Sequence, residues 1–251
     1  VKIITKCGVT WDQEMKGDLF NKVNGIQLYK NLNSDSIKRE IEESLKRMGT
    51  DYVDVYMTHW QSIEGSEYYV PIQKTMEVLN DLKAQGKIKA IGAANVDIKQ
   101  IQEYLKHGEL DIVQAKYSIL DRGIEDEIIP CCRENGVTIQ AYSPLEMGLL
   151  SGTMPRDYKP VGAQIPKKWF QPDNMQKAMD VMDQWKPLCE KYNCTIANLA
   201  LAWILAQGEF INLLSGSTTV DQIKENVKST ELELDPADVA MMRDMVEEID
   251  K

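Results

Sequence analysis

The stretch Asp54-Val55-Tyr56-Met57-Thr58-His59-Trp60 decides the fold. Its apolar and aromatic residues suit a strand that is covered on both faces, as in a parallel sheet. His59 stands where this strand ends, at the carboxyl edge where parallel α/β sheets and barrels hold their chemistry. We therefore take His59 as a candidate catalytic residue. The alternative is a core histidine that is hydrogen-bonded to a neighbouring carbonyl group.

Helix and strand patterns alternate on both sides of this stretch, which is typical of a parallel sheet with helical crossovers. Residues 9–32 read as a polar loop, and residues 143–174 as a lid or binding loop. We count about six strands, whereas a closed parallel barrel needs roughly eight. The sheet is therefore either open, or a barrel whose first βα units would precede Val1. No linker divides the chain, so residues 1–251 are expected to form a single domain.

The composition is that of a globular protein. The chain has 251 residues, 43% hydrophobic and 27% charged, and a formal net charge of -10. This acidic balance argues against nucleic acid and anionic membrane surfaces as partners. The 5 cysteines show no zinc or redox spacing and indicate free thiols in a reducing cytoplasm. No apolar run reaches the ~18 residues of a membrane span, and no signal peptide is visible.

Several chemically useful side chains fall at strand ends. Lys6, His59 and Asn95 end their strands, and Gln114 and Tyr142 lie within or at the ends of two more. A lysine and a histidine at one mouth could share proton handling. Lys6 could equally form a Schiff base or be a solvated strand-edge charge.

No nucleotide-binding motif of the Rossmann or P-loop type is present. The loop at residues 215–219 suits either a phosphate or an ordinary helix cap. No metal-ligand spacing is found, so no metal site is predicted.

Together these segments resemble the aldo-keto reductases. The resemblance rests on Thr5-Lys6, residues 51–56 running into His59-Trp60, residues 91–95, Gln114, residues 142–145 with 148–150, and residues 216–226. Residues 17–22, 28–32 and 117–122 resemble the bacterial, NADH-preferring methylglyoxal reductase branch.

The resemblance implies a (β/α)8 TIM barrel that binds a nicotinamide dinucleotide and reduces a carbonyl by hydride transfer. It implies that Lys6 and His59 are the catalytic lysine and histidine. The family's catalytic tyrosine and aspartate would lie before Val1, so the first βα units are expected to be missing. We therefore expect that this polypeptide alone is inactive.

The resemblance also implies the cofactor site. Ala94 stands where the family has a serine, and Thr153 where it often has a lysine. The positions that grip the 2′-phosphate of NADPH are neutral here, so NADH is favoured over NADPH. The expected cofactor-binding residues are Ala94, Asn95, Gln114, Tyr142, Ser143, Leu145, Gly148, Leu150, Gly216, Ser217, Thr218, Gln222, Glu225 and Asn226.

The substrate is less well defined by the sequence. Trp11, Trp60 and Trp169 fall in loops that could wall a pocket for a small carbonyl compound such as methylglyoxal, although plain packing is the alternative for each. Two other functions remain open: a Schiff-base aldolase that uses Lys6, and an inactive nucleotide-binding barrel that acts as a partner subunit. The sequence leaves the oligomeric state open.

Overall fold

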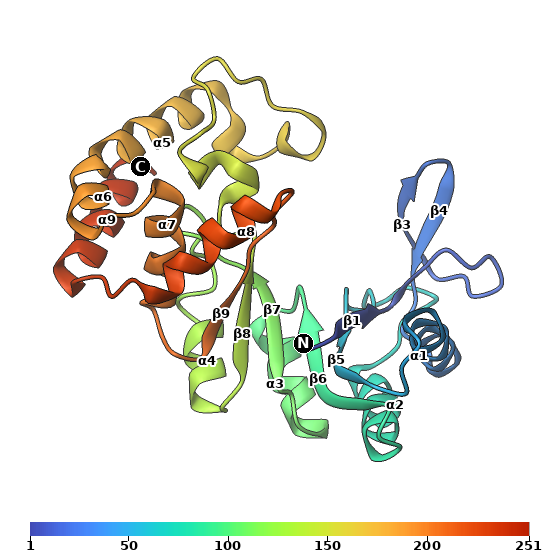
Figure 1. Cartoon of the computed structure of the whole chain (residues 1–251). Helices are drawn as coiled ribbons and strands as arrows, with labels where there is room; N and C mark the ends of the chain where they lie inside the picture. Colours follow the sequence, from blue (N-terminus) through green and yellow to red (C-terminus); the bar gives the residue numbers. More distant parts are fainter. Residues whose placement is uncertain (251) are drawn as a thin grey trace. The chain divides into compact units, whose positions relative to one another are not determined.

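The computed structural model describes residues 1–250, and the chain divides into two compact units (Figure 1). Unit 1 comprises residues 1–115 and 126–139, and unit 2 comprises residues 116–125 and the chain from residue 140 onward.

Unit 1 is built on parallel strands. They follow the order β1 (Ile4–Cys7), β5 (Val53–Thr58), β6 (Ile88–Ala94) and β7 (Ile112–Lys116), with the start of β8 (Thr138–Tyr142) next. The pairs β1–β5, β5–β6 and β6–β7 are all parallel. Every residue of β5 is buried, which confirms the prediction of a strand covered on both faces.

Helices connect these strands, as the alternating pattern predicted. The first, α1, begins after Asn33, whose side chain accepts a hydrogen bond from the Ser36 N–H, and ends at Gly49 with φ of 65°. Ile37 and Ile41 of this helix are fully buried. The helices of unit 1 are α1 (Ser34–Met48), α2 (Ile72–Ala84), α3 (Ile98–His107) and α4 (Ile128–Glu134).

The prediction of a polar loop over residues 9–32 is wrong. The segment forms a small antiparallel sheet in the order β2 (Val9–Thr10), β4 (Ile26–Lys30) and β3 (Asp18–Val23). Asn24-Gly25 makes the turn, with φ of 49° and 84°, which is the geometry that a two-residue hairpin needs. Figure 1 shows the β3–β4 hairpin extending from unit 1.

Unit 2 is mainly helical. Its strand β9 (Ile211–Leu214) neighbours the end of β8, so the main sheet has 6 strands. Trp185 and Trp203 are fully buried among its helices. These helices are α5 (Pro172–Gln184), α6 (Lys186–Tyr192), α7 (Ile196–Leu205), α8 (Val220–Val227) and α9 (Pro236–Ile249).

The long segment between β8 and α5 carries only short 3-10 turns. They are η1 (Glu146–Ser151), η2 (Gly162–Gln164) and η3 (Lys168–Phe170), and a fourth, η4 (Lys228–Glu231), follows α8. The α/β class predicted from the sequence is confirmed. Among residues 1–250, no helix is both long and apolar enough to span a membrane.

Candidate active site

Within unit 1, the predicted site residues lie at neighbouring strand ends. Lys6 of β1 is paired in register with Met57 of β5, and the His59 N–H donates to the Cys7 carbonyl oxygen at 2.9 Å. The Asn95 N–H donates to the Gln114 carbonyl oxygen at 3.1 Å, and the Asn95 amide donates to the His59 carbonyl oxygen at 2.9 Å. The fold therefore brings Lys6, His59, Asn95 and Gln114 to one edge of the sheet.

Lys6 and His59 affect each other electrostatically. Burial lowers the pKa of Lys6. Burial, and next the charge of Lys6, lower the pKa of His59. His59 is therefore a neutral imidazole at neutral pH, able to donate one hydrogen bond from the ring N–H.

A buried polar network supports the turn after His59. The hydroxyl groups of Thr58 and Tyr104 are 3.0 Å apart, and the Tyr104 hydroxyl donates to Gln61 Oε1 at 2.7 Å. The Gln61 amide donates to Thr58 Oγ1 at 3.0 Å and to the Ala94 carbonyl oxygen at 3.3 Å. These bonds fix the ends of β5 and β6 relative to each other, and with them the backbone that carries His59 and Asn95.

The hairpin contacts the site through Trp60. The Trp60 ring is 6.3 Å from the His59 ring at an interplanar angle of 29°, and 5.7 Å from the Phe20 ring. Lys30 Nζ lies 4.6 Å from the Trp60 ring centroid, a cation–π distance. Phe20 and Lys30 escaped the sequence reasoning because their segment was read as a loop; Asn24-Gly25 was the signal for the hairpin.

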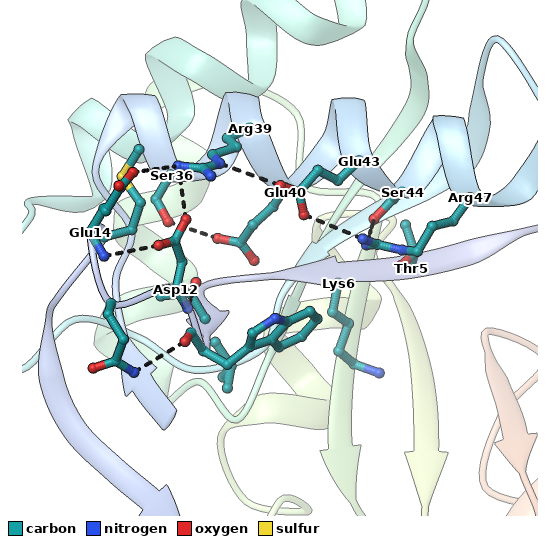
Figure 2. A pocket seen from close by; sticks show the side chains of 15 residues that line it. Thr5, Lys6, Asp12, Glu14, Ser36, Arg39, Glu40, Glu43, Ser44 and Arg47 are labelled. Atoms are coloured by element: carbon teal, nitrogen blue, oxygen red, sulfur yellow. Dashed lines mark hydrogen bonds and ion pairs between the residues drawn. The ribbon is translucent and has the colours of Figure 1, made fainter. Parts of the chain in front are cut away.

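A cavity of about 730 Å³ in unit 1 is lined by Lys6, Trp11 and the polar face of α1. Arg39 and Arg47 occupy this face and pair with acidic side chains: Arg39 Nη1 is 2.8 Å from Asp12 Oδ2, and Arg47 Nη1 is 3.3 Å from Glu43 Oε2. Figure 2 shows Lys6 extending away from these ion pairs. Lys6 lines this cavity, and burial lowers the pKa of its ammonium group.

Glu40 also lies in this cavity and was missed from the sequence. Its carboxylate oxygens accept from the Gly8 N–H at 3.1 Å and from the Ser36 hydroxyl at 3.0 Å. Burial raises the pKa of Glu40 to about 7. The signal was an acidic residue one turn after Ile37, on the inward face of its helix.

Unit 2 holds the remaining predicted cofactor residues. Burial raises the pKa of the half-buried Tyr142, and the charge of Lys116 opposes that rise. The loop after Tyr142 contains Ser143, Leu145, Gly148 and Leu150, and Leu150 is buried. Leu145 also lines a second cavity, of about 360 Å³.

This second cavity gathers the predicted adenosine-end residues Gly216, Gln222, Glu225 and Asn226. The Gln222 side-chain oxygen accepts from the Thr218 N–H at 2.7 Å and from its hydroxyl at 3.1 Å. The Asn226 amide donates to the Ser217 hydroxyl at 3.1 Å. The loop over residues 215–219 is thus fastened to α8 by its own side chains.

Two details of this cavity bear on the ligand. Thr219 caps α8 by accepting from the Gln222 N–H at 3.2 Å, so this loop includes an ordinary helix cap. Glu225, which accepts from the Thr195 hydroxyl at 3.2 Å, contributes a carboxylate to the wall. No arginine or lysine is among the cavity's lining residues within the described chain.

The predicted substrate tryptophans differ in exposure. Trp11 is 58% exposed, whereas Trp169 is 5% exposed. The Trp169 indole N–H donates to the Leu120 carbonyl oxygen at 2.8 Å. Packing accounts for the position of Trp169, and its part in a substrate pocket stays a prediction. Within residues 1–250, no group of three or more metal-ligating side chains is arranged to hold an ion.

Comparison with known proteins gives a family and several relatives. The model of the aldo/keto reductase family matches residues 1–247. The NADH-specific methylglyoxal reductase of Escherichia coli (strain K12) is 55% identical over 251 residues, covering 100% of this chain and 76% of that protein. The aldo-keto reductase str7 of Strobilurus tenacellus is 32% identical over 253 residues, covering 98% of this chain and 68% of that protein.

Solved structures with the same fold also match. The glycerol dehydrogenase AKR11B4 from Gluconobacter oxydans has a TM-score of 0.85 at 24% identity, covering 98% of this chain and 71% of that one. An aldo-keto reductase from Klebsiella pneumoniae, in complex with NADPH, has a TM-score of 0.66 at 22% identity, covering 86% of this chain and 66% of that one. Together with the family match, these likenesses support an α/β fold of the TIM-barrel type for this chain.

Proposed function

Because this chain belongs to the aldo/keto reductase family, we propose that it reduces the carbonyl group of a small aldehyde or ketone with NADH, and that methylglyoxal is one such substrate. The family resemblance read from the motifs is confirmed. Two finer expectations, that the first βα units are missing and that this polypeptide alone is inactive, receive no support, since the family model matches from residue 1 and the Escherichia coli relative matches the whole chain.

One observation carries the proposal: Lys6 and His59 lie at adjacent strand ends, close enough for the charge of Lys6 to lower the pKa of His59. NADH supplies a hydride when bound. As negative charge develops on the carbonyl oxygen, the Lys6 ammonium group would stabilise it and supply the proton that completes the alcohol, and the neutral His59 N–H would orient it. The indole of Trp60 packs beside His59.

Groups of the kind that bind a nicotinamide dinucleotide occur in each unit. In unit 1, Asn95 and Gln114 offer amide groups to the nicotinamide carboxamide. In unit 2, Tyr142 offers a ring for stacking, and the cavity of about 360 Å³ offers hydrogen-bonding groups to adenosine. Each assignment follows the family resemblance residue by residue.

Charge favours NADH over NADPH. Gly216, Thr218 and Gln222 are neutral, and Glu225 places a carboxylate in the wall of the cavity. Glu225 is already paired with Lys228, whose Nζ is 2.7 Å from Glu225 Oε2. A 2′-phosphate would find no arginine or lysine among the described residues that line the cavity. The Escherichia coli relative is named as NADH-specific, which supports the same preference.

A steady-state assay with methylglyoxal tests the proposal. We expect NADH-dependent reduction, with a lower KM for NADH than for NADPH. His59→Gln should lower kcat/KM by about 100-fold or more because it removes the group that orients the oxygen. The matched control is His107→Gln, since the chain has 2 histidines and His107 pairs with Glu103 on α3.

Other outcomes would favour other functions. Saturable NADH binding with no turnover of any short aldehyde would favour the inactive nucleotide-binding barrel. An adduct on Lys6 trapped by borohydride, formed without nicotinamide, would favour the aldolase. Equal losses in the His59 and His107 variants would contradict the role given to His59.

A further inference from the structure

A buried ionic cluster lies beneath the loop after Tyr142. The Glu146 side chain is 3% exposed, and its Oε1 accepts from the Ser118 hydroxyl at 2.8 Å. Lys116 Nζ is 3.0 Å from Glu146 Oε1 and 2.6 Å from Asp121 Oδ2. All these residues belong to unit 2. None of them was singled out from the sequence as a site residue.

The loop above this cluster has an unusual backbone. Ser143, Glu146 and Met147 have φ of 55°, 44° and 53°, and Gly148 has φ of 97°. A non-glycine residue in this left-handed region is strained, because its Cβ lies too close to the backbone. Such a conformation persists only where the surroundings over-determine it.

The loop's own hydrogen bonds account for part of that constraint. The Glu146 N–H donates to the Ser143 carbonyl oxygen at 2.9 Å, and the Gly148 and Leu150 N–H groups donate to the Leu145 carbonyl oxygen at 2.9 and 3.1 Å. The buried carboxylate of Glu146 is the side-chain contact that ties this turn to residues 116–121. Glu146 thereby anchors the loop to the protein interior.

The charge balance explains why a buried carboxylate is tolerated there. Burial opposes the charge on Lys116, but its hydrogen bond to Asp121 and the charge of Glu146 raise its pKa above the usual value. A carboxylate beneath phosphate groups would repel them if it were unpaired. With Lys116 beside it, the repulsion is offset.

We propose that Glu146 is a positioning residue for the cofactor: its ion pair with Lys116 and its hydrogen bond from Ser118 hold the backbone of residues 143–150 in the strained form that receives the pyrophosphate. This inference rests on the proposed nicotinamide dinucleotide site. It adds that the shape of the loop depends on the buried ion pair of Glu146 and Lys116, which acts on the cofactor only through the loop backbone.

Substitutions separate the ion pair from the hydrogen bond. Glu146→Gln keeps an acceptor for the Ser118 hydroxyl but removes the charge that pairs with Lys116. Lys116→Met leaves Glu146 as a buried carboxylate without its partner, which is the costlier change. The double variant Lys116→Met with Glu146→Gln removes both charges and should recover part of the loss seen in Lys116→Met alone.

The test is the dissociation constant of three ligands: NADH, ADP-ribose and adenosine, the last two by displacement of NADH fluorescence. We expect Glu146→Gln to weaken NADH and ADP-ribose about tenfold and to leave adenosine within about twofold, because adenosine lacks the pyrophosphate. Lys116→Met should weaken the first two further, and the double variant should bind them better than Lys116→Met does. The matched control is the exposed Glu209→Gln in unit 2.

Each result has a consequence. Unchanged NADH binding by Glu146→Gln, or an equal loss for all three ligands, overturns the positioning role. A double variant that binds as poorly as Lys116→Met overturns the charge-pair account. If Lys116→Met does not fold, Glu146→Gln and the double variant decide the question alone. Wild-type protein that binds none of the ligands overturns the proposed function itself.

Discussion

At the scale of single residues, Glu40 shows how burial changes the pKa of a side chain. Its carboxylate is enclosed by α1 and the start of β2, where the Gly8 N–H and the Ser36 hydroxyl satisfy both oxygens. Burial raises the pKa of Glu40 to about 7, whereas an unfolded glutamate titrates near 4.3. The folded state therefore holds a proton that the unfolded state releases between these pH values.

This difference predicts a pH dependence of stability. As pH rises from about 4.5 to about 7, the unfolded state loses its proton first, so the free energy of unfolding falls. The destabilisation is complete above pH 7 and amounts to about 4 kcal/mol at most. Glu40→Gln, which can keep both hydrogen bonds, should remove it. The variant should gain stability relative to wild type between pH 5 and pH 8.

Thermal unfolding midpoints at these two pH values check the prediction. Glu67→Gln is the control, because Glu67 is exposed and should shift neither midpoint. A Glu40→Gln midpoint that follows wild type at both pH values would show that Glu40 titrates normally.

The sequence revealed which polar side chains stand at strand ends, but it did not reveal which residues contact each other across the fold. Lys6 and His59 were found because each ends a recognisable strand. Lys116 and Glu146 were not, because their contact joins residues 30 positions apart through a turn whose left-handed backbone leaves no periodic pattern. The family resemblance identified residues 143–150 as a cofactor-binding loop. The contacts of Glu146 that stabilise this loop became evident only in the structure.

At the scale of elements, the β3–β4 hairpin is the main departure from the sequence prediction. Its strands carry exposed apolar residues, Leu19 at 73% and Ile26 at 53%, and polar residues on both faces. Period-two alternation is therefore weak, and Asn24-Gly25 was the stronger evidence. The hairpin matters because Phe20 and Lys30 contact Trp60, which lies beside His59.

Two glycines in this hairpin should differ sharply on substitution. A Cβ at Gly17 would lie 2.0 Å from the Lys30 carbonyl oxygen, whereas one at Gly25 would meet nothing within 4 Å. Gly17→Ala should therefore destabilise by about 2 kcal/mol or more. Gly25→Ala should cost about 1 kcal/mol, for its positive φ alone.

Unfolding midpoints of both variants, followed by tryptophan fluorescence, measure this difference. Gly17→Ala should also alter the native emission, since Trp60 packs on the hairpin. Equal midpoints for the two variants would mean that the hairpin's base is not closely packed against Lys30.

Not every helix boundary can be read from the spacing of apolar residues. The helices α5 and α6 meet at Trp185. Pro187 lies just inside α6, where a proline favours a new helix start over continuation. Helical spacing continues across the break, so periodicity alone could not reveal it.

At the scale of the whole molecule, alternating elements and strand ends sufficed to predict the α/β class and the edge of the sheet that carries the chemistry. The division into two units did not follow from the sequence, because no linker or change of composition marks it. Unit 1 holds the proposed amide, ammonium and imidazole groups, and unit 2 holds the cavity of about 360 Å³.

The central claim is that this chain binds a nicotinamide dinucleotide through the residues proposed above, and titration with NADH tests it most directly. Binding is followed by nicotinamide fluorescence in wild type, in Asn95→Ala for unit 1 and in Glu225→Ala for unit 2. We predict one NADH per chain, with affinity reduced about tenfold or more in each variant. Absence of saturable binding, or full affinity in either variant, would contradict the account.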